Sequence, residues 1–195
     1  GGSTRPSTID ISATGVSKTL SIDQDLSSTG NQTLTAAGGI TISGARSFTS
    51  TSGTINTASA LSGNSSFDIS GNADIDGAIT GITTFSVSGT SNIGADVTTS
   101  STQTYSGAVT LSANVDLTGT TVTTNGTVAG GTNDLTVTGN VVFGNGTADT
   151  VTGVAVLDVT GNTTINTNTI TTSSTQTYGD ATSDNITIGA ATTLT

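Results

Sequence analysis

Short segments of alternating apolar and polar residues recur along the whole chain. Each holds two apolar residues separated by one small polar residue, as in Phe67-Asp-Ile69 and Leu135-Thr-Val137. Successive side chains of a β-strand point to opposite faces, so this alternation predicts short strands with one buried face. Gly, Asn or Ala follows most of these segments within a few residues, which indicates tight corners. Because apolar residues nowhere recur at helical spacing, the sequence predicts an all-β protein with essentially no helix.

The chain also repeats itself over a long period. The octapeptide Thr98-Thr-Ser-Ser-Thr-Gln-Thr-Tyr105 returns unchanged at residues 171–178, and its upstream flank returns with it. A weaker copy lies nearer the amino terminus. The sequence therefore holds about two and a half copies of a unit of roughly 72 residues. The approximate boundaries of the copies are 28–97, 98–170 and 171–195.

A shorter repeat lies inside this unit. The pattern [Phe/Leu]-x-[Ile/Val]-[Ser/Thr]-Gly begins at four positions: Phe67, Phe85, Leu135 and Leu157. The first two starts and the last two starts are separated by roughly 18–22 residues, which is long enough for one coil of a β-solenoid. The wider gap between Phe85 and Leu135 indicates that coil length varies or that a coil lacks the motif. We therefore predict that residues 1–195 form a single β-solenoid of about ten coils, in which short strands are joined by corners.

A string of β-sandwich domains, each as long as the long repeat, is the alternative architecture. A sandwich core needs many large side chains between its two sheets, and this chain has four Phe and no Trp. A solenoid core is narrower and can be filled by stacked Ile, Val, Leu and Thr. The composition favours the solenoid, with Phe48, Phe67, Phe85 and Phe143 in its core.

The composition by itself suggests a disordered polar linker, because Ser and Thr make up 73 of the 195 residues. Residues typical of disorder are nearly missing, however: the chain has one Pro, one Lys and no Glu. Thr, Ile and Val together account for more than a third of the chain, and these β-branched side chains favour a pleated surface. The chain is therefore expected to fold.

The inventory of reactive and charged residues excludes several classes of function. Without His or Cys, the chain lacks the usual zinc ligands and the parts of a Ser–His or Cys–His mechanism. Three cations against 13 acids cannot neutralise a phosphate backbone, which argues against nucleic-acid binding. No apolar run is long enough for membrane insertion. We expect a non-enzymatic protein that needs no cofactor.

Two closely spaced acids, Asp74 and Asp76, are the candidate for a metal site. Residues two apart on a strand face the same side, as a weak calcium site would require. The same carboxylates on a solvated face are the simpler interpretation. Residues 47–195 contain no Lys, Arg or His to assist carboxylate catalysis, so no catalytic residue is assigned.

Tyr105 and Tyr178 occupy equivalent positions in the repeat and could form a surface that stacks on sugars. The alternative is that both are structural, each covering a corner or filling the core. A second binding hypothesis concerns Thr-x-Thr segments such as Thr102-Gln-Thr104, because flat Thr arrays on a β-solenoid bind ice in several antifreeze proteins. Their position drifts against the apolar pattern, which weakens the ice hypothesis.

Three segments taken in order carry a family resemblance: 98–105, Val109-Thr-Leu-Ser-Ala-Asn-Val-Asp-Leu117 and Leu135-Thr-Val-Thr-Gly-Asn140. They resemble the β-strand-repeat regions of filamentous haemagglutinin-like surface exoproteins, bacterial adhesins of the two-partner-secretion and autotransporter types. The similarity covers most of residues 28–195. It implies a right-handed parallel β-helix, export to the cell surface, and an adhesive or fibre-forming role.

The carboxyl-terminal residues indicate which partners the chain is expected to have. Residues 180–195 continue the repeat pattern and include no amphipathic segment that would cap a terminal coil. We therefore expect either a segment of a longer rod or rods that stack end to end. The expected partners are copies of the chain or adjoining solenoid coils, with glycans as the partner of a binding module.

Overall fold

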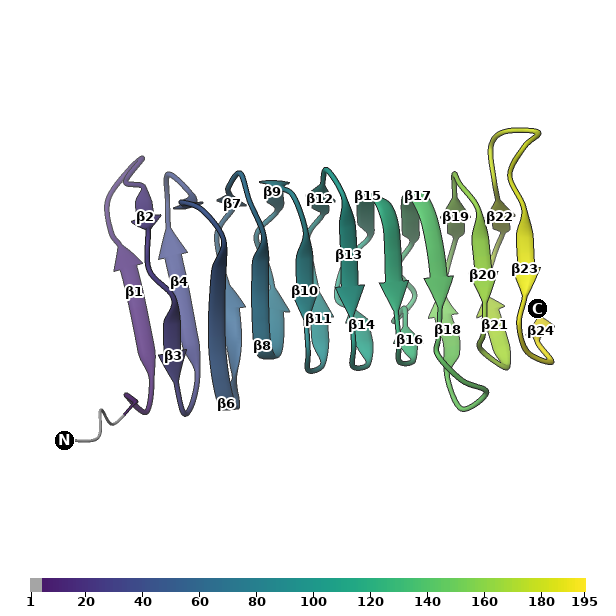
Figure 1. Ribbon diagram of the computed structural model, residues 1–195, viewed down its shortest axis with the longest axis horizontal. Coiled ribbons are helices and arrows are strands. Elements are labelled where there is room, and N and C mark those ends of the chain that lie inside the picture. The colour runs from purple at the N-terminus through teal and green to yellow at the C-terminus, as the bar shows by residue number, and fades with distance from the viewer. Residues whose placement is uncertain (1–4) are drawn as a thin grey trace.

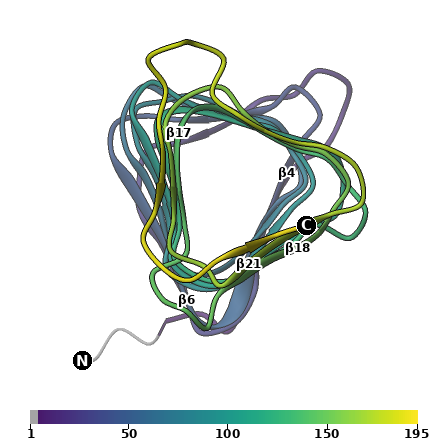
Figure 2. The ribbon, with the colours of Figure 1, turned by 90° about the vertical axis from the view of Figure 1, so that its right-hand side faces the viewer.

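The computed structural model describes residues 5–195 as one right-handed parallel β-solenoid of about nine turns. Figure 1 shows the coils stacked along the long axis, with the two termini at opposite ends. Seen from the carboxyl-terminal end, the coils are roughly triangular, and the chain runs anticlockwise as it approaches the viewer (Figure 2). The all-β prediction and the parallel β-helix are both confirmed, and the described residues contain no helix.

Within residues 5–195, twenty-four strands build the three sides of the solenoid. The first side contains β1 (Ile9–Ala13), β4 (Gln32–Ala36), the second halves of β6 (Arg46–Thr57) and β8 (Phe67–Ile75), β11 (Ser91–Ile93), β14 (Val109–Leu111), β16 (Val128–Ala129), β18 (Thr150–Val154), β21 (Thr169–Thr172) and β24 (Thr193–Leu194). The second side contains β2 (Leu20–Ile22), β5 (Ile40–Ile42), β7 (Leu61–Ser62), β9 (Ile79–Ile82), β12 (Val97–Thr99), the first halves of β15 (Val115–Thr124) and β17 (Leu135–Phe143), β19 (Leu157–Val159) and β22 (Gln176–Tyr178). The third side contains β3 (Leu26–Ser28), the first halves of β6 and β8, β10 (Phe85–Val87), β13 (Thr102–Tyr105), the second halves of β15 and β17, β20 (Thr163–Ile165) and β23 (Ile186–Ile188).

Coil length varies along the rod. Ala73 pairs with Ser91, whereas Val128 pairs with Val151, which is a longer step along the chain. The longer coils contain extended corners, such as residues 144–149 between β17 and β18. These corners explain why the chain makes about nine turns and not the ten predicted from a uniform coil.

The core is a set of columns that run along the axis. Alternate strand residues point inward, and 35 buried apolar side chains of the described part of the chain form one continuous cluster. Four aromatic rings from successive coils pack in a chain: Phe48 on Phe67 at 4.8 Å, Phe67 on Phe85 at 5.6 Å, and Phe85 on Tyr105 at 6.0 Å between ring centroids. Phe143 is buried as well, so the core placement of the four phenylalanines is confirmed.

Glycines stack on one another where the chain turns between sides. Gly71, Gly89 and Gly107 lie in successive coils at the corner from the third side to the first. The Gly89 N–H donates to the Gly71 carbonyl at 2.9 Å, and the Gly107 N–H donates to the Gly89 carbonyl at 3.2 Å. A Cβ on any of them would collide with backbone of the preceding coil. The Gly that ends the short sequence motif is therefore a corner residue.

The long sequence repeat does not return to the same side of the solenoid. Gln103–Tyr105 lies on the third side, and the identical residues Gln176–Tyr178 lie on the second. The weaker upstream copy, Gln32–Leu34, lies on the first side. Each copy of the repeat is thus displaced by one side of the triangle, which means that the same strand-and-corner sequence fits all three sides.

Gly139 provides a test of the corner packing. It has a φ of +127°, and a Cβ there would collide with the Gly119 carbonyl. We predict that Gly139→Ala lowers the free energy of unfolding by roughly 2–4 kcal/mol. The control is Gly146→Ala, because no atom lies within 4 Å of its Cβ position, and its effect should stay within about 0.5 kcal/mol. Equal effects of the two substitutions in urea unfolding would contradict this account.

Candidate functional site

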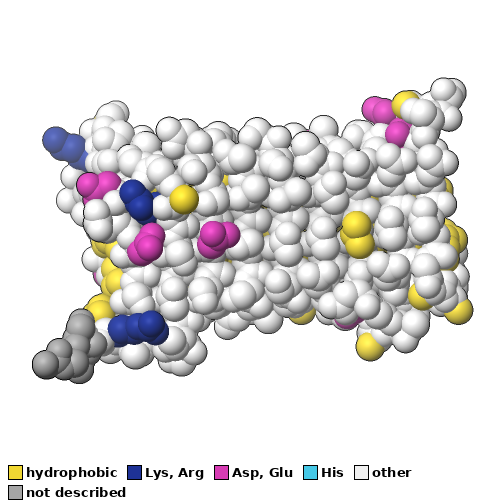
Figure 3. All heavy atoms as spheres, viewed as in Figure 1, with side chains coloured by type: hydrophobic (Ala, Val, Ile, Leu, Met, Phe, Trp, Pro, Cys, Tyr) yellow, Lys and Arg dark blue, Asp and Glu magenta, His cyan; other side chains and the backbone are white. Residues whose placement is uncertain are grey.

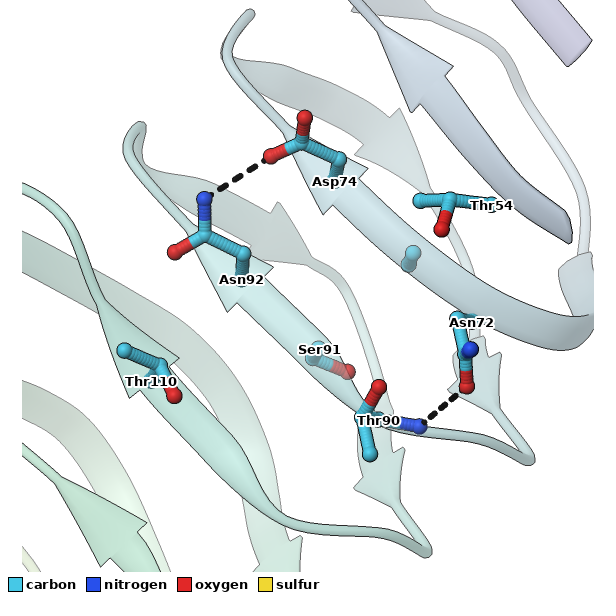
Figure 4. A pocket seen from close by; sticks show the side chains of 8 residues that line it. Thr54, Asn72, Asp74, Thr90, Ser91, Asn92 and Thr110 are labelled. Carbon is cyan, nitrogen blue, oxygen red and sulfur yellow. Dashed lines mark hydrogen bonds between the residues drawn. The ribbon is translucent and has the colours of Figure 1, made fainter. Parts of the chain in front are cut away.

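A shallow polar groove lies on the outer surface of the first side (Figure 4). It crosses β6, β8, β11 and β14 and has a volume of about 340 Å³. Its lining is Thr54, Asn72, Ala73, Asp74, Thr90, Ser91, Asn92 and Thr110. No aromatic or cationic side chain is among them, so the groove offers only hydroxyl, amide and carboxylate groups.

Asp74 is the centre of an amide–carboxylate ladder in this groove. Asn56, Asp74 and Asn92 are in register on three successive coils. Asn56 Nδ2 donates to Asp74 Oδ2 at 2.8 Å, and Asn92 Nδ2 donates to Asp74 Oδ1 at 2.9 Å. Both oxygens of the carboxylate are therefore already hydrogen-bonded along the rod axis. The two asparagines were not identified from the sequence, although each stands one coil length from Asp74 along the chain.

The Asp74 and Asp76 carboxylates lie on the same side, as their spacing predicted. Asn56 Nδ2 donates to Asp76 Oδ2 at 2.9 Å as well as to Asp74. Among residues 5–195, no group of three or more His, Cys, Asp or Glu side chains could hold a metal ion. Calcium binding by the pair stays a prediction, and the contacts that the structure does show are those of a polar ladder.

A second groove, about 310 Å³ in volume, lies at the corner from the first side to the second. Its acids hold the backbone of the next coil. Asp96 Oδ1 accepts the Asp116 N–H at 2.9 Å, and Asp134 Oδ1 accepts the Val156 N–H at 3.0 Å. Between them, Asn114 Oδ1 accepts the Asp134 N–H at 3.0 Å. These side chains satisfy amide groups at the corner, where the chain leaves one side for the next.

The two tyrosines differ in their surroundings. Tyr105 is fully buried against Phe85, so the proposal that it forms part of a sugar-stacking surface is wrong, and the structural alternative holds. Its inward position on β13 follows from the alternation of that strand. Tyr178 is only partly buried because it lies on β22, which has a neighbouring strand on one edge alone. A ligand-stacking role for Tyr178 stays a prediction.

The solenoid has three kinds of corner, one between each pair of adjacent sides. At one corner of each kind, a glutamine side chain points into the interior. In all three cases a hydroxyl residue lies four positions earlier and donates to the carbonyl two positions after itself. The pairs are Ser28 with Gly30, Thr99 with Ser101, and Thr172 with Ser174. The three glutamines are Gln32, Gln103 and Gln176. The recurrence of hydroxyl-x-x-x-Gln was visible in the sequence, but its role in closing a corner was not predicted.

Each glutamine links its own coil to the next. Gln103 Nε2 donates to the Val97 carbonyl and to the Thr118 carbonyl of the following coil, both at 2.8 Å. Its Oε1 accepts the Tyr105 hydroxyl at 2.9 Å. Gln176 and Tyr178 repeat this last contact at 2.9 Å. Leu34 replaces the tyrosine in the upstream copy, and the Gln32 Oε1 atom is buried without a partner.

Outward Thr-x-Thr rows are short. Thr102 and Thr104 pair in register with Thr121 and Thr123 of the next coil. One coil further on, the same positions are Asn140 and Val142. The regular array that an ice-binding surface requires is therefore interrupted on this side, and ice binding stays a prediction.

Comparison with known proteins gives no relative. No protein-family model, no curated protein and no solved structure matches this chain. The resemblance to filamentous haemagglutinin-like exoproteins thus stays a prediction from repeat style. Among the described residues, none forms a helix long and apolar enough to cross a membrane.

The Tyr105–Gln103 contact can be tested against its partly exposed counterpart. Tyr105→Phe leaves Gln103 Oε1 buried without a hydrogen-bond donor, which should lower the free energy of unfolding by about 1–3 kcal/mol. Tyr178→Phe removes the same hydroxyl where water can replace it, so its cost should be below about 1 kcal/mol. Denaturant unfolding of both variants measures the difference. An equal loss in both would mean that burial does not set the cost.

The same tyrosines predict an alkaline loss of stability. Burial raises the pKa of Tyr178 to about 12 from an ordinary value of 10.0, and it raises the pKa of Tyr105 as well. The folded state therefore holds the phenol protons more tightly than the unfolded state. The part of the folding stability that depends on the bound phenol protons is fully present below about pH 10 and is lost as the pH rises toward 12. Unfolding free energies measured across this range should fall, and the Tyr105→Phe/Tyr178→Phe double variant should fall less steeply.

Proposed function

We propose that this chain is a non-catalytic structural segment of an extracellular bacterial fibre or adhesin, extended by the stacking of further coils. The observation that carries the proposal is the chemistry of the two end coils. Strands β1, β2 and β3, and likewise β22, β23 and β24, each pair with a neighbour along one edge only. Their other edges present backbone donors and acceptors that one more coil would satisfy.

The apolar residues of the last coil support the same proposal. Ile186 is 50% exposed, Ile188 is 54% exposed and Leu194 is 41% exposed. The core residues Ile165 and Ile170, which occupy the same columns one coil earlier, are fully buried. Covering three aliphatic side chains in this way is favourable by the same hydrophobic effect that stabilises the interior of the rod. An additional coil therefore completes the core as well as the sheet.

The surface chemistry suits a passive rod outside the cell. The sides present mainly Ser and Thr hydroxyls, and the chain lacks His, Cys, Met and Trp. Such a surface has few groups that oxidise or react. The extracellular location and the adhesive context rest on this composition and on the resemblance in repeat style. The polar ladders and glutamine corners form hydrogen bonds between successive coils, which is a structural role.

Electron microscopy of the negatively stained chain tests the proposal. With about nine coils at a spacing of 4.7–4.9 Å, a single copy should be roughly 45 Å long. We expect thin rods of several times this length, whose mean length increases with protein concentration. Rods that remain one copy long at millimolar concentration would contradict the proposal.

A charge placed on the exposed end strand should prevent the extension. Ile188→Asp introduces a carboxylate where the next coil would bury an aliphatic side chain, and it should leave single-copy rods. Thr110→Asp is the matched control, because Thr110 faces outward on the mid-rod strand β14. It adds the same charge and should leave the rod length unchanged. Circular dichroism of both variants checks that the solenoid itself stays folded.

A further inference from the structure

We propose that a second copy of this chain adds head to tail, turned by one side of the triangle, with Lys18 of the added copy facing Asp180 of the first. The inference rests on the proposed stacking of coils and specifies its geometry. The amino-terminal coil of the second copy, formed by β1, β2 and β3, covers the last coil of the first. The partner is therefore identical in sequence, and the assembly is polar.

The helical path of the chain around the axis selects this rotation. The last strand, β24, lies on the first side, and the next position along the helical path is the second side, directly above β22. If β1 of the added copy takes that position, β2 falls above β23 and β3 above β24. All three unpaired edges are then filled at the ordinary coil spacing. Without rotation, one strand position stays empty on two of the sides, and with the opposite rotation one stays empty on a single side.

The side chains brought together by this rotation repeat pairings found inside the rod. Ile9 is the first inward-facing residue of β1 and would lie on Gln176. Inside the rod, Gln32 pairs with Ile55, and Gln103 pairs with Val122. The partly buried Leu20 and Leu26 of the amino-terminal coil lie where they can cover the exposed Ile186 and Leu194. Copies of the internal repeat lie on the first, third and second sides, so the sides already accept one another's sequences.

The charges select the same rotation independently. Lys18 is exposed in the corner from the first side to the second in the amino-terminal coil, between β1 and β2. The rotation places this corner over residues 179–185, which contain the exposed Asp180. Asp184 Oδ2 accepts the N–H groups of Asp180 and Ala181 at 3.1 and 2.8 Å and so fixes that loop.

No other rotation gives Lys18 an acid in the last coil. The remaining corners there, residues 173–175 and 189–192, consist of Ser, Thr, Gly and Ala. Figure 3 shows one face of the molecule, with cations and acids side by side at the amino-terminal end and acids without cations on a protruding corner at the opposite end. Figure 2 shows that the corners projecting from the triangle include one in the first coil and one in the last.

Charge reversal with rescue tests the pairing. Lys18→Glu and Asp180→Lys should each raise the concentration at which half of the chains are assembled by roughly threefold to tenfold. The double variant Lys18→Glu/Asp180→Lys should return this concentration to near the wild-type value. Its net charge equals the wild-type value of −10, so a general charge effect cannot explain the recovery. Sedimentation velocity across a concentration series measures assembly.

A second double variant keeps the interpretation specific. Lys18→Glu/Asp76→Lys also has the wild-type net charge, but Asp76 lies in the middle of the rod and should give no rescue. Equal recovery in both double variants, or in neither, would overturn the Lys18–Asp180 pairing while leaving stacking intact. A wild-type chain that does not assemble would instead overturn the stacking on which this inference rests. A filament reconstruction in which successive copies are related without the displacement of one side would overturn the rotation.

Discussion

Backbone hydrogen bonds that run parallel to the rod axis are the constraint on which the rest of this structure depends. Each coil donates to and accepts from its neighbours, so equivalent residues must lie directly above one another at about 4.8 Å. On the flat sides, ordinary strand pairing meets this requirement. At the corners the backbone turns, and the stack is kept by glycines such as Gly89 and by asparagine ladders. Asn140 Oδ1 accepts the Asn162 N–H, and Asn162 Oδ1 accepts the Asn185 N–H, both at 2.9 Å.

Because the constraint acts along the axis, it makes no distinction between the three sides. A strand-and-corner sequence that stacks well on one side stacks equally well on another. This explains why Gln32, Gln103 and Gln176 lie at three different corners, yet each donates from Nε2 to a carbonyl of the next coil. It also explains how a long sequence repeat can be displaced by one side per copy without disturbing the core. Copies of the repeat that follow one another along the chain therefore lie on different sides around the axis.

This relation sets the limit of what the sequence predicts. Alternation along segments such as Phe67–Ile69 determines a strand with a buried face, and the following Gly determines a corner, so the fold class follows from local chemistry. The side on which a strand lies depends on the summed lengths of all preceding corners, which no local pattern contains. For the same reason the Asn56–Asp74–Asn92 ladder becomes apparent only once the coil register is known. Tyr105 and Tyr178 are preceded by the same seven residues, and their distance from the end coil decides which one is buried.

The distribution of charge bears on the proposed growth of the rod. Residues 47–195 carry ten Asp and no Lys or Arg, and several of these carboxylates line the sides of successive coils. Two rods lying side by side would bring such surfaces together, and at an ionic strength of about 0.1 M they repel within a Debye length of roughly 10 Å. The ends differ, because they expose aliphatic side chains and unpaired strand edges, and the chain's cations lie within residues 5–46. In the proposed assembly, attraction therefore acts along the axis and repulsion across it, which favours a thin rod over a bundle.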